Sequence, residues 1–307
     1  MNKPSVAVVG CGKVGSALAL LLKERGYPVV AVASRSVQSA RELARAVGCG
    51  ACEQPWEATQ KADLVFITTP DREIAPVSEL IAREGGFRPG QVVAHTSGAH
   101  ASRELHGVRE AGAMAVSIHP LQSFADVAGA MENLPGSYFA LEGDEAAMPV
   151  ARQVVMDLKG NAFIIRAEDK PLYHAAACIA SNYLVSLMHL ATNLYGRFGL
   201  SQKQAFEALY PLVRGTINNI RRVGPVEALT GPVARGDVPT IAGHLPALDR
   251  VGSLESRLYR LVGLYTIQVA REKGSIDAGQ ARKLEEVFTA PANGRVLLKS
   301  GEVYFHE

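Results

Sequence analysis

The sequence predicts an α/β domain, in which a parallel sheet carries helices on both faces, followed by an all-α domain. The length of 307 residues favours about two domains, at roughly 150 residues each. Short β-rich runs alternate with helical patterns as far as Arg166, which is typical of a parallel sheet, and mainly helical patterns follow. We therefore predict one domain over residues 1–167 and a second over residues 168–307.

The first domain is expected to contain about eight strands, each a run of apolar or β-branched residues bounded by turn residues. In order, they are Ser5–Val9, Pro28–Ala33, a short run near Gly50, Asp63–Thr68, Gln91–Ala94, Met114–Ile118, Ser137–Leu141 and Ala162–Ile165. Helices are expected between these strands, because the intervening residues carry one apolar face. The expected helices are Gly15–Arg25, Val37–Val47, Ile74–Glu84, Ser102–Ala111 and Glu145–Leu158.

The second domain is expected to be helical almost to its end. It opens with a long helix, rich in alanine and leucine, from Pro171 to about Arg197. Further helices are predicted near Lys203–Arg222, Thr240–Arg250, Ser253–Lys273 and Ala278–Val287. A terminal hairpin is predicted from two short β-rich runs, Val296–Leu298 and Val303–Phe305.

The composition excludes several classes of protein. With 48% hydrophobic and 20% charged residues, the chain has the composition of a folded protein and not of a disordered one. The formal charge of +2 is too balanced for nucleic-acid binding. We find no apolar run long enough to span a membrane, the chain begins close to a strand, and its four cysteines are too few for a disulfide framework. We therefore expect a cytoplasmic protein that does not bind membranes.

Cys49 and Cys52 form a C-x-x-C pair, but no second pair or suitably spaced histidine accompanies it. We therefore expect no metal site. A more specific motif follows the first predicted strand, where Gly10, Gly12 and Gly15 fit the pattern G-x-G-x-x-G. The motif leads into a helix, so its glycines can make a tight turn and admit a pyrophosphate to the helix N-terminus. The predicted phosphate loop consists of Gly10, Cys11, Gly12, Lys13, Val14 and Gly15.

The residues after the second strand favour NADP(H) over NAD(H). An NAD-binding domain usually places a carboxylate here for the ribose 2′-hydroxyl, whereas this chain has Ser34, Arg35 and Ser36. A guanidinium flanked by two hydroxyls can bind a 2′-phosphate through charge-assisted hydrogen bonds. The alternative is that Arg35 only lies at a solvated helix start.

Polar residues follow three later strands, at the sheet edge where ligands bind in open α/β folds. Thr69 and Pro70 are expected along the nicotinamide side of the cofactor, Ser97 and Gly98 near its ring or the substrate, and His119 beside the substrate. Each group could instead be an ordinary capped turn, and His119 could be structural.

Two further segments carry candidate residues. Lys170 and His174 lie one turn apart on the long helix, so they share a face, while Asn182 lies farther round. A lysine beside a histidine can polarise or protonate a carbonyl oxygen. The alternative is a surface lysine beside a helix cap and a half-buried histidine. Arg235, in a turn before a helix that Asp237 can cap, is a candidate ligand for a substrate carboxylate, or part of a plain linker.

The chain resembles the Rossmann-like oxidoreductases with a C-terminal helical domain of formerly unknown function, from which a third type of ketopantoate reductase has been recognised. The resemblance covers about Val6 to Val287. Besides the glycine motif, it is carried by the segments DLVFITTPD (63–71), HTSGA (95–99), SIHPLQSF (117–124), KPLYHAAA (170–177), ASNYL (180–184) and LTGPVARGD (229–237).

More distantly, the chain is similar to pyrroline-5-carboxylate reductase, 6-phosphogluconate dehydrogenase and prephenate dehydrogenase. These resemblances imply a Rossmann domain, a 6-phosphogluconate dehydrogenase-like helical domain that builds a homodimer, and an active site in the cleft between them. In hydroxyacid dehydrogenases a lysine on the first long helix acts with an asparagine one turn on. Lys170 matches that lysine, but His174 replaces the asparagine.

The sequence thus predicts an NADPH-dependent reductase of a small oxo acid, with ketopantoate as the best single substrate. Lys170, assisted by His174 or Asn182, would stabilise and protonate the alkoxide, and Ser97, His119 or Arg235 would hold the carboxylate. The alternatives are a prephenate-type dehydrogenase, a pyrroline-type imine reductase, and an NADP-binding sensor without catalytic activity.

Overall fold

The computed structural model describes residues 3–291 and divides the chain into two compact units, Met1–Leu184 and Val185–Glu307. The division falls later than residue 167, the predicted boundary. The first turns of the long helix belong to the first unit because they pack on it, and Lys170 in the first of these turns is completely buried. The predicted hairpin after Val296 lies outside the described residues.

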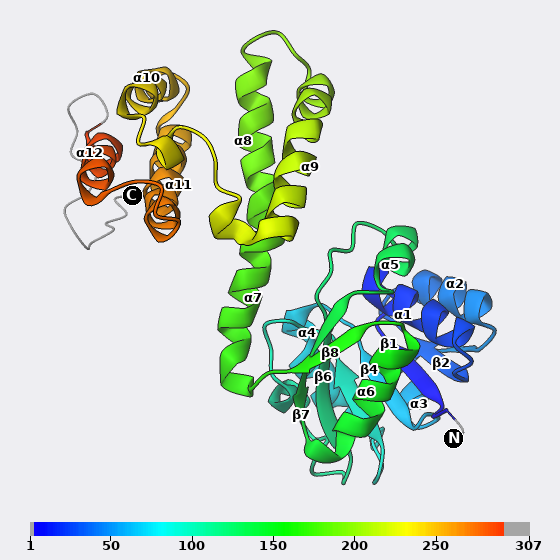
Figure 1. Ribbon diagram of the computed structural model, residues 1–307. Coiled ribbons are helices and arrows are strands. Elements are labelled where there is room, and N and C mark those ends of the chain that lie inside the picture. The colour runs from blue at the N-terminus through cyan, green and yellow to red at the C-terminus, as the bar shows by residue number, and fades with distance from the viewer. Residues whose placement is uncertain (1–2, 292–307) are drawn as a thin grey trace. The chain divides into compact units, whose positions relative to one another are not determined.

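The first unit contains one eight-stranded sheet in the order β3-β2-β1-β4-β5-β6-β7-β8 (Figure 1). All the predicted strands are present. They are β1 (Val6–Val9), β2 (Val29–Ala33), β3 (Gly50–Cys52), β4 (Leu64–Ile67), β5 (Val92–His95), β6 (Met114–Pro120), β7 (Tyr138–Gly143) and β8 (Asn161–Ile164).

One strand pair departs from the expected parallel arrangement, because β7 pairs antiparallel with β6. The connection between them contains only the seven-residue helix α5 (Val127–Asn133), which packs on α1 (Lys13–Glu24). The chain therefore re-enters the sheet from the end at which it left, as an antiparallel connection must. The remaining neighbouring pairs, including β7 with β8, are parallel.

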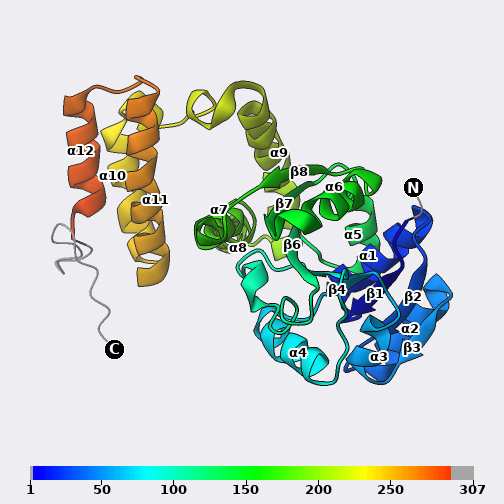
Figure 2. The ribbon, with the colours of Figure 1, turned by 90° about the horizontal axis from the view of Figure 1, so that it is seen from below.

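The sheet is covered on both faces, as the alternation of side chains along β1 shows. Val6 and Val8 belong to one hydrophobic cluster, whereas Ala7 and Val9 belong to another. The first cluster also contains residues of α1, α2 (Val37–Val47) and α6 (Met148–Asp157), and the second contains residues of α3 (Pro55–Thr59) and α4 (Asp71–Arg83). Figure 2 shows α4 and α6 on opposite sides of the sheet.

One predicted helix is wrong. The segment Ser102–Ala111 contains only a short 3₁₀ turn, η1 (Ser102–Glu104), followed by irregular chain. The backbone N–H of Ser102 is bonded to the side chain of Glu142, and Gly107 has a positive φ of 77°. A left-handed glycine in the middle of the segment is incompatible with a continuous α-helix.

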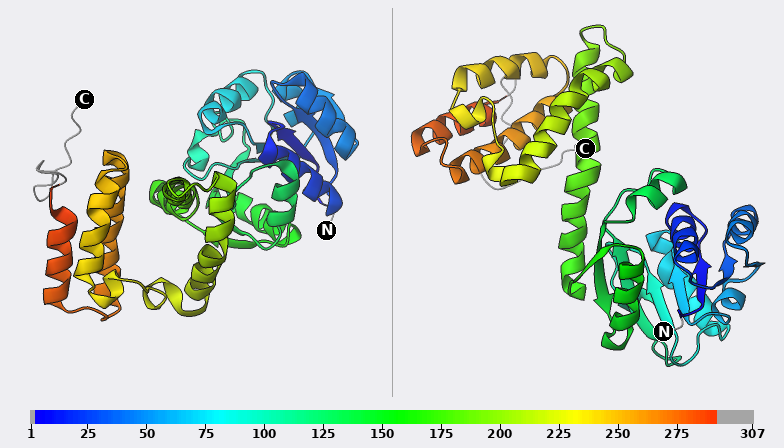
Figure 3. Two further views of the ribbon diagram at one scale, coloured as in Figure 1. Left: turned by 90° about the horizontal axis from the view of Figure 1, so that it is seen from above. Right: turned by 45° about the vertical axis from the view of Figure 1, so that its right-hand side comes forward.

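The remaining helical elements follow β7. They are η2 (Glu145–Ala147) before α6, then η3 (Ala167–Asp169), α7 (Lys170–Cys178), the π-helical turn η4 (Ile179–Tyr183), α8 (Leu184–Gly196), α9 (Gln202–Glu227), η5 (Val233–Arg235), α10 (Val238–Asp249), α11 (Ser253–Glu272) and α12 (Ala278–Thr289). Helices α10, α11 and α12 enclose a separate apolar core that includes Ile241, Ile267 and Phe288. Figure 3 shows these three helices, coloured gold to red, gathered in one bundle.

The long helix of residues 167–196 is unusually exposed for its composition. By length and composition alone it could cross a membrane, contrary to the expectation from the sequence, but the core helix of a soluble protein passes the same test. Only 6% of its most apolar window is buried. Leu172, Ile179 and Val185 each expose more than half of their surface. The described residues therefore leave a large apolar surface of the helix uncovered.

Candidate functional site

A cavity of about 800 Å³ lies at the carboxyl ends of β1, β2 and β4 in the first unit. Ligands bind at this edge in open α/β sheets, and the volume is that of a typical ligand pocket. Most of the predicted cofactor residues line it: Gly10, Cys11, Gly12, Lys13, Val14, Ser34, Arg35, Ser36, Thr69 and Pro70. Gly15, Ser97 and Gly98 are not part of the lining, and the last two lie in a neighbouring cluster.

The glycine loop has the shape that its sequence predicts, with a different role for each glycine. Gly10 has a φ of 108°, and a Cβ on it would lie 2.8 Å from the backbone of Thr68. A Cβ on Gly15 would overlap the carbonyl oxygen of Gly10, so this glycine allows α1 to pack against the loop. A Cβ on Gly12 would meet no protein atom within 4 Å. Gly12 therefore faces open space, where a ligand could come close to the protein backbone.

The segment after β2 reaches the cavity as predicted, but one of its hydroxyls has a structural role. Ser36 is the N-cap of α2 and accepts a hydrogen bond of 3.2 Å from the backbone N–H of Ser39. The guanidinium of Arg35 makes no ion pair within the described part of the chain. Glu53, which was not among the predicted residues, also lines the cavity. Because β3 pairs with β2, the residues after β3 had to lie near this edge as well.

Thr69 supplies a second sign that the cavity is built for a ligand. Its hydroxyl is buried and has no hydrogen-bond partner among the described residues. A buried hydroxyl without a partner costs about 1–3 kcal/mol, so such groups usually meet a ligand or water. The orphan hydroxyl, the open space at Gly12 and the size of the cavity all fit a dinucleotide.

A second cluster is organised around Lys170, the first residue of α7. Its side chain is 0% exposed, so the interpretation of Lys170 as an ordinary surface lysine is wrong. The Nζ atom donates to the backbone oxygen of Ser97 at 2.9 Å and to the hydroxyl of Ser117 on β6. The ammonium group is thus held beneath the loop that follows β5.

Ser97 has structural partners on all sides. It is only 4% exposed, and its Oγ accepts hydrogen bonds from the backbone N–H groups of Ala99 and His100. Its own N–H donates to Nδ1 of His95. The predicted contact of Ser97 with a ligand can therefore come only from its O–H group acting as a donor.

Gly98 brings two histidines together. A Cβ on this residue would lie 2.6 Å from Nδ1 of His174 and 2.7 Å from Nε2 of His119, so only glycine leaves room for both rings. Nδ1 of His119 lies 2.7 Å from the hydroxyl of Tyr173, a residue that the sequence analysis did not select. Nδ1 of His174 is buried without a partner among the described residues. The two imidazoles therefore present polar atoms beside Gly98.

The electrostatics of this cluster are set by burial and by Lys170. Burial lowers the pKa of Lys170 to about 8, although Glu142 and Asp71 partly oppose this effect. Burial and the nearby lysine lower the pKa of both His95 and His119 to about 3. At neutral pH the cluster thus contains an ammonium group beside the neutral rings of His95 and His119.

Two further predicted site residues lie on other elements. Asn182 lies in the exposed π-helical turn η4, roughly three turns beyond Lys170. Arg235 belongs to the second unit, where it ends η5 and lies 3.9 Å from Asp237, which caps α10 as predicted.

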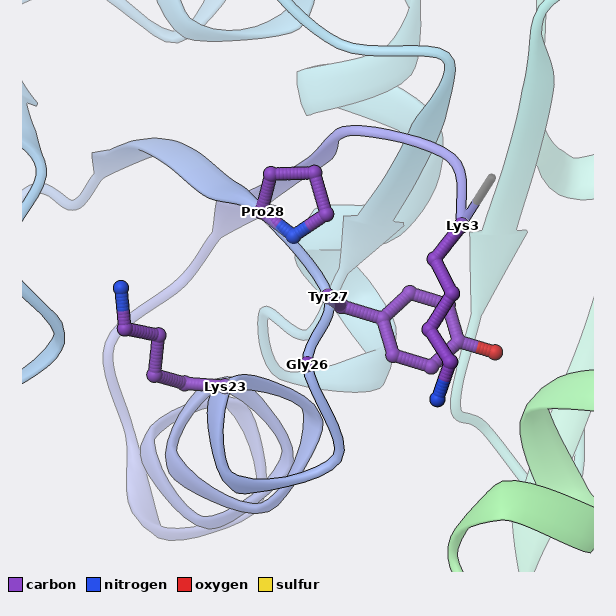
Figure 4. Close-up of a pocket in the computed structure, with 5 residues that line it drawn as sticks. All are labelled: Lys3, Lys23, Gly26, Tyr27 and Pro28. Atoms are coloured by element: carbon purple, nitrogen blue, oxygen red, sulfur yellow. The ribbon is translucent and has the colours of Figure 1, made fainter. Parts of the chain in front are cut away.

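A smaller cavity of about 470 Å³ lies at the opposite edge of the sheet, before β1 and β2 (Figure 4). Lys3 lies 4.6 Å from the ring centre of Tyr27 and 3.1 Å from the carboxylate of Asp157. The hydroxyl of Tyr27 donates to the same carboxylate at 2.7 Å. These contacts join Lys3 and Tyr27 to Asp157 of α6. The polar groups of the three side chains are therefore paired with one another without a ligand.

The fold and the phosphate loop define the class of this chain: a Rossmann-like domain followed by a helical domain. Two family models match it accordingly. Residues 1–120 match the Rossmann-like domain, and residues 137–266 match a domain of unknown function, DUF2520. No curated protein matches the chain with significance.

Three solved structures share the fold over nearly their whole length. A protein from Bacteroides fragilis, provisionally assigned as an NADP oxidoreductase, has 22% identity and a TM-score of 0.69, and the match covers 90% of this chain and 99% of that one. Protein TM1727 from Thermotoga maritima has 28% identity and a TM-score of 0.67, covering 87% and 97%. An imine reductase from Pseudomonas sp. has 20% identity and a TM-score of 0.62, covering 94% and 99%.

Proposed function

We propose that the protein is an NADPH-dependent reductase of a small oxo acid, with ketopantoate as the first substrate to test. The observation that carries the proposal is the adjacency, within one unit, of a dinucleotide-sized cavity and a buried ammonium group flanked by neutral histidines. NADPH bound in the cavity would supply the hydride. The assignment of an NADP oxidoreductase to the similar Bacteroides fragilis protein agrees with this class of reaction.

The cofactor would be held by the residues that line the cavity. The backbone N–H groups at the start of α1 would bind the pyrophosphate, and Gly12 leaves the space for it. Arg35 would bind the 2′-phosphate, assisted by Ser34. Thr69, whose hydroxyl has no partner among the described residues, would donate or accept a hydrogen bond on the nicotinamide side.

Lys170 would assist the reaction through its charge and its proton. Positive charge near a carbonyl oxygen stabilises the alkoxide that forms there. With a pKa of about 8, the amine can give up a proton near neutral pH, whereas the neutral histidines cannot. His119 and His174 would orient the substrate beside Gly98 through hydrogen bonds. Because Lys170 is completely buried, direct contact with the substrate would require the loop at Ser97 to move.

The most direct test of the catalytic role is Lys170→Met, which removes the charge and keeps most of the volume. We expect turnover to fall by about 10²–10⁴-fold, the usual contribution of a general acid, with NADPH affinity nearly unchanged. Lys283→Met, at an exposed lysine of α12, is the matched control. Equal turnover of the two variants would remove Lys170 from the mechanism.

Imine reduction is the second candidate, and the similarity in fold to an imine reductase favours it. The two reactions share the cofactor and differ in whether carbon–oxygen or carbon–nitrogen bonds are reduced. NADPH oxidation should therefore be measured with ketopantoate, other small oxo acids and cyclic imines in parallel. Turnover of imines alone would select the second candidate. NADPH binding without turnover of either class would favour a non-catalytic sensor.

We further propose that the protein is a homodimer joined through its long helix. Leu172, Ile179 and Tyr183 follow one another at helical spacings of seven and four residues and are all exposed. Contiguous exposed apolar patches of this kind mark surfaces that a partner covers. A second copy of the same stripe would do so with two-fold symmetry.

A further inference from the structure

Glu142 is the buried acidic partner of the Lys170 cluster, and the proposed reaction does not yet use it. It is 8% exposed and lies on β7. In the described part of the first unit, Glu142 and Lys170 are the two buried side chains of the Lys, Arg, Asp and Glu types. Burying an isolated charge is costly, so buried charges are normally paired or hydrogen-bonded.

The sheet places the two charges on either side of Ser117. In the antiparallel pairing of β6 with β7, Ser117 lies directly opposite Glu142, so the two side chains share a face. The hydroxyl of Ser117 also receives the hydrogen bond from Lys170. One strand residue therefore separates the ammonium group from the carboxylate.

The same two side chains hold the two ends of one loop. Lys170 binds the backbone oxygen of Ser97 at 2.9 Å. Glu142 accepts hydrogen bonds from the backbone N–H and the hydroxyl of Ser102, at 2.6 Å and 2.9 Å. Gly98, which leaves room for the two histidines, lies between these anchors. The loop is therefore hydrogen-bonded at one end to a buried cation and at the other end to a buried anion.

We propose that Glu142 is a positioning residue of the active site, which fixes the loop of residues 97–102 and supplies the counter-charge that keeps Lys170 protonated. The catalytic part of this inference depends on the proposed reductase function. The part that concerns the charge pair does not, because it can be measured without a substrate.

The charges around Lys170 support the second role. Burial lowers its pKa, while Glu142 and Asp71 raise it, and the net value is about 8. The other titratable groups that face it, His95 and His119, are neutral above about pH 3 and add no positive charge at neutral pH. Without the carboxylate of Glu142, burial would be opposed only by Asp71. The Lys170 amine would then lose its proton at a lower pH.

A purely structural role makes a different prediction. Arg109 donates to the hydroxyl of Ser102 at 3.1 Å and also forms an ion pair with Asp144, so Glu142 could simply complete a brace for the loop. Removing a brace lowers stability but leaves the titration of Lys170 unchanged. Two variants, Glu142→Gln and Ser102→Ala, distinguish the electrostatic role of Glu142 from a purely structural one.

In Glu142→Gln the side chain keeps its shape, and its amide can still bond to Ser102, but the charge is lost. In Ser102→Ala the charge of Glu142 remains, and the hydrogen bonds of the Ser102 hydroxyl with Glu142 and Arg109 are lost. The readout is the pH titration of the Lys170 amine, followed by NMR of isotopically labelled lysine and assigned by the signal missing from Lys170→Met. Glu145→Gln, at an exposed neighbouring glutamate, is the control.

We expect Glu142→Gln to lower the titration midpoint of Lys170 by about one pH unit, the size of a typical effect of a nearby charge. Ser102→Ala and Glu145→Gln should leave the midpoint unchanged. If the reductase function holds, turnover in Glu142→Gln should decline at correspondingly lower pH than in the wild type. An unchanged midpoint in Glu142→Gln overturns the proposal, even if turnover falls.

Should Glu142→Gln not fold, the double variant Glu142→Gln with Lys170→Met provides the test. If the two charges balance each other, removing both should restore a folded protein. If the double variant also fails to fold, Glu142 acts only through Ser102, and the proposal is overturned. None of these readouts needs a substrate, so failure of the reductase assignment would be recognised separately, as absence of turnover in the wild type.

Discussion

The hydroxyl of Tyr173 lies 2.7 Å from Nδ1 of His119, and the two rings meet edge to face with their centres 5.5 Å apart. This contact joins the first turn of α7 to the end of β6. Because burial and Lys170 lower the pKa of His119 to about 3, the imidazole is neutral at physiological pH. Burial raises the pKa of Tyr173 to about 12, so its phenol keeps its proton. The pair can therefore fix which nitrogen of His119 carries hydrogen.

The first prediction concerns this pair. We expect the Tyr173 hydroxyl to donate to Nδ1, which leaves the hydrogen of His119 on Nε2, next to Gly98. Tyr173→Phe should then allow both tautomers and lower turnover by about tenfold, the equivalent of about 1.4 kcal/mol, without weakening NADPH binding. Nitrogen NMR of labelled histidine should show a single tautomer in the wild type. A mixture of tautomers in the wild type would contradict the assignment.

The second prediction separates two glycines of the phosphate loop. Gly15→Ala places a methyl group against the carbonyl of Gly10 and should destabilise the protein by about 1–3 kcal/mol, the usual cost of overpacking. Gly12→Ala meets no protein atom and should change stability by less than about 0.5 kcal/mol. Only Gly12→Ala should therefore yield a stable protein that binds NADPH poorly, as thermal unfolding and fluorescence titration can establish. Normal NADPH affinity in Gly12→Ala would place the cofactor elsewhere.

The third prediction tests the choice of cofactor. Arg35→Ala should weaken NADPH binding by about 10–100-fold, because a charge-assisted hydrogen bond contributes about 1.5–3 kcal/mol, and should leave NADH binding unchanged. Arg41→Ala, at an exposed arginine of α2, is the control and should change neither affinity. Equal losses for NADPH and NADH in Arg35→Ala would mean that Arg35 does not read the 2′-phosphate.

The fold was largely predictable because its signals are local. A central strand such as β1 is a continuous apolar run. The glycine motif after it typically joins a strand to the start of a helix. The two errors in the first unit arose from contacts distant in sequence. The expected helix at Ser102 gives way to a hydrogen bond with Glu142, forty positions along the chain. The reversal of β7 depends on how α5 packs on α1.

The candidate site likewise contains residues that local sequence signals predict and residues that only tertiary contacts bring together. The residues that line the larger cavity follow a motif and the ends of strands, so most of them could be predicted from position alone. The environment of Lys170 could not, because its partners lie far away in the sequence, Ser97 in the loop after β5 and Ser117 on β6, and its complete burial is a tertiary property. Tyr173 was not predicted, although it directly precedes His174. Its position one helical turn after Lys170 could have indicated that it lies on the same face of the helix.

The fourth prediction concerns acid stability. His95 is completely buried, and its pKa falls from 6.5 to about 3 because of burial and the charge of Lys170. Below pH 6.5 the unfolded chain binds a proton here that the folded chain does not, so stability is complete above pH 6.5 and is lost as the pH falls towards 3. The loss is about 1.4 kcal/mol per pH unit for this residue.

His95→Asn should flatten this acid dependence, because asparagine does not titrate and its oxygen can still accept the hydrogen bond from Ser97. The exposed His106→Asn should not alter it. Chemical unfolding measured between pH 7.5 and 4.5 checks both variants. Identical acid slopes in the wild type and His95→Asn would show that His95 is protonated in the folded protein at these pH values.

The last prediction tests the dimer. If the stripe of Leu172, Ile179 and Tyr183 lies at a two-fold interface, Ile179→Glu places two carboxylates in an apolar contact, close to their own copies. The dimer should then dissociate, because buried unpaired charges of like sign cost several kcal/mol. Light scattering should give twice the chain mass of 32.7 kDa for the wild type and 32.7 kDa for the variant. Met156→Glu, on the equally exposed Met156 of α6, should remain dimeric because it lies outside the stripe. A monomeric wild type, or dissociation of both variants, would place the interface elsewhere or remove it, and the apolar stripe would then need a different partner.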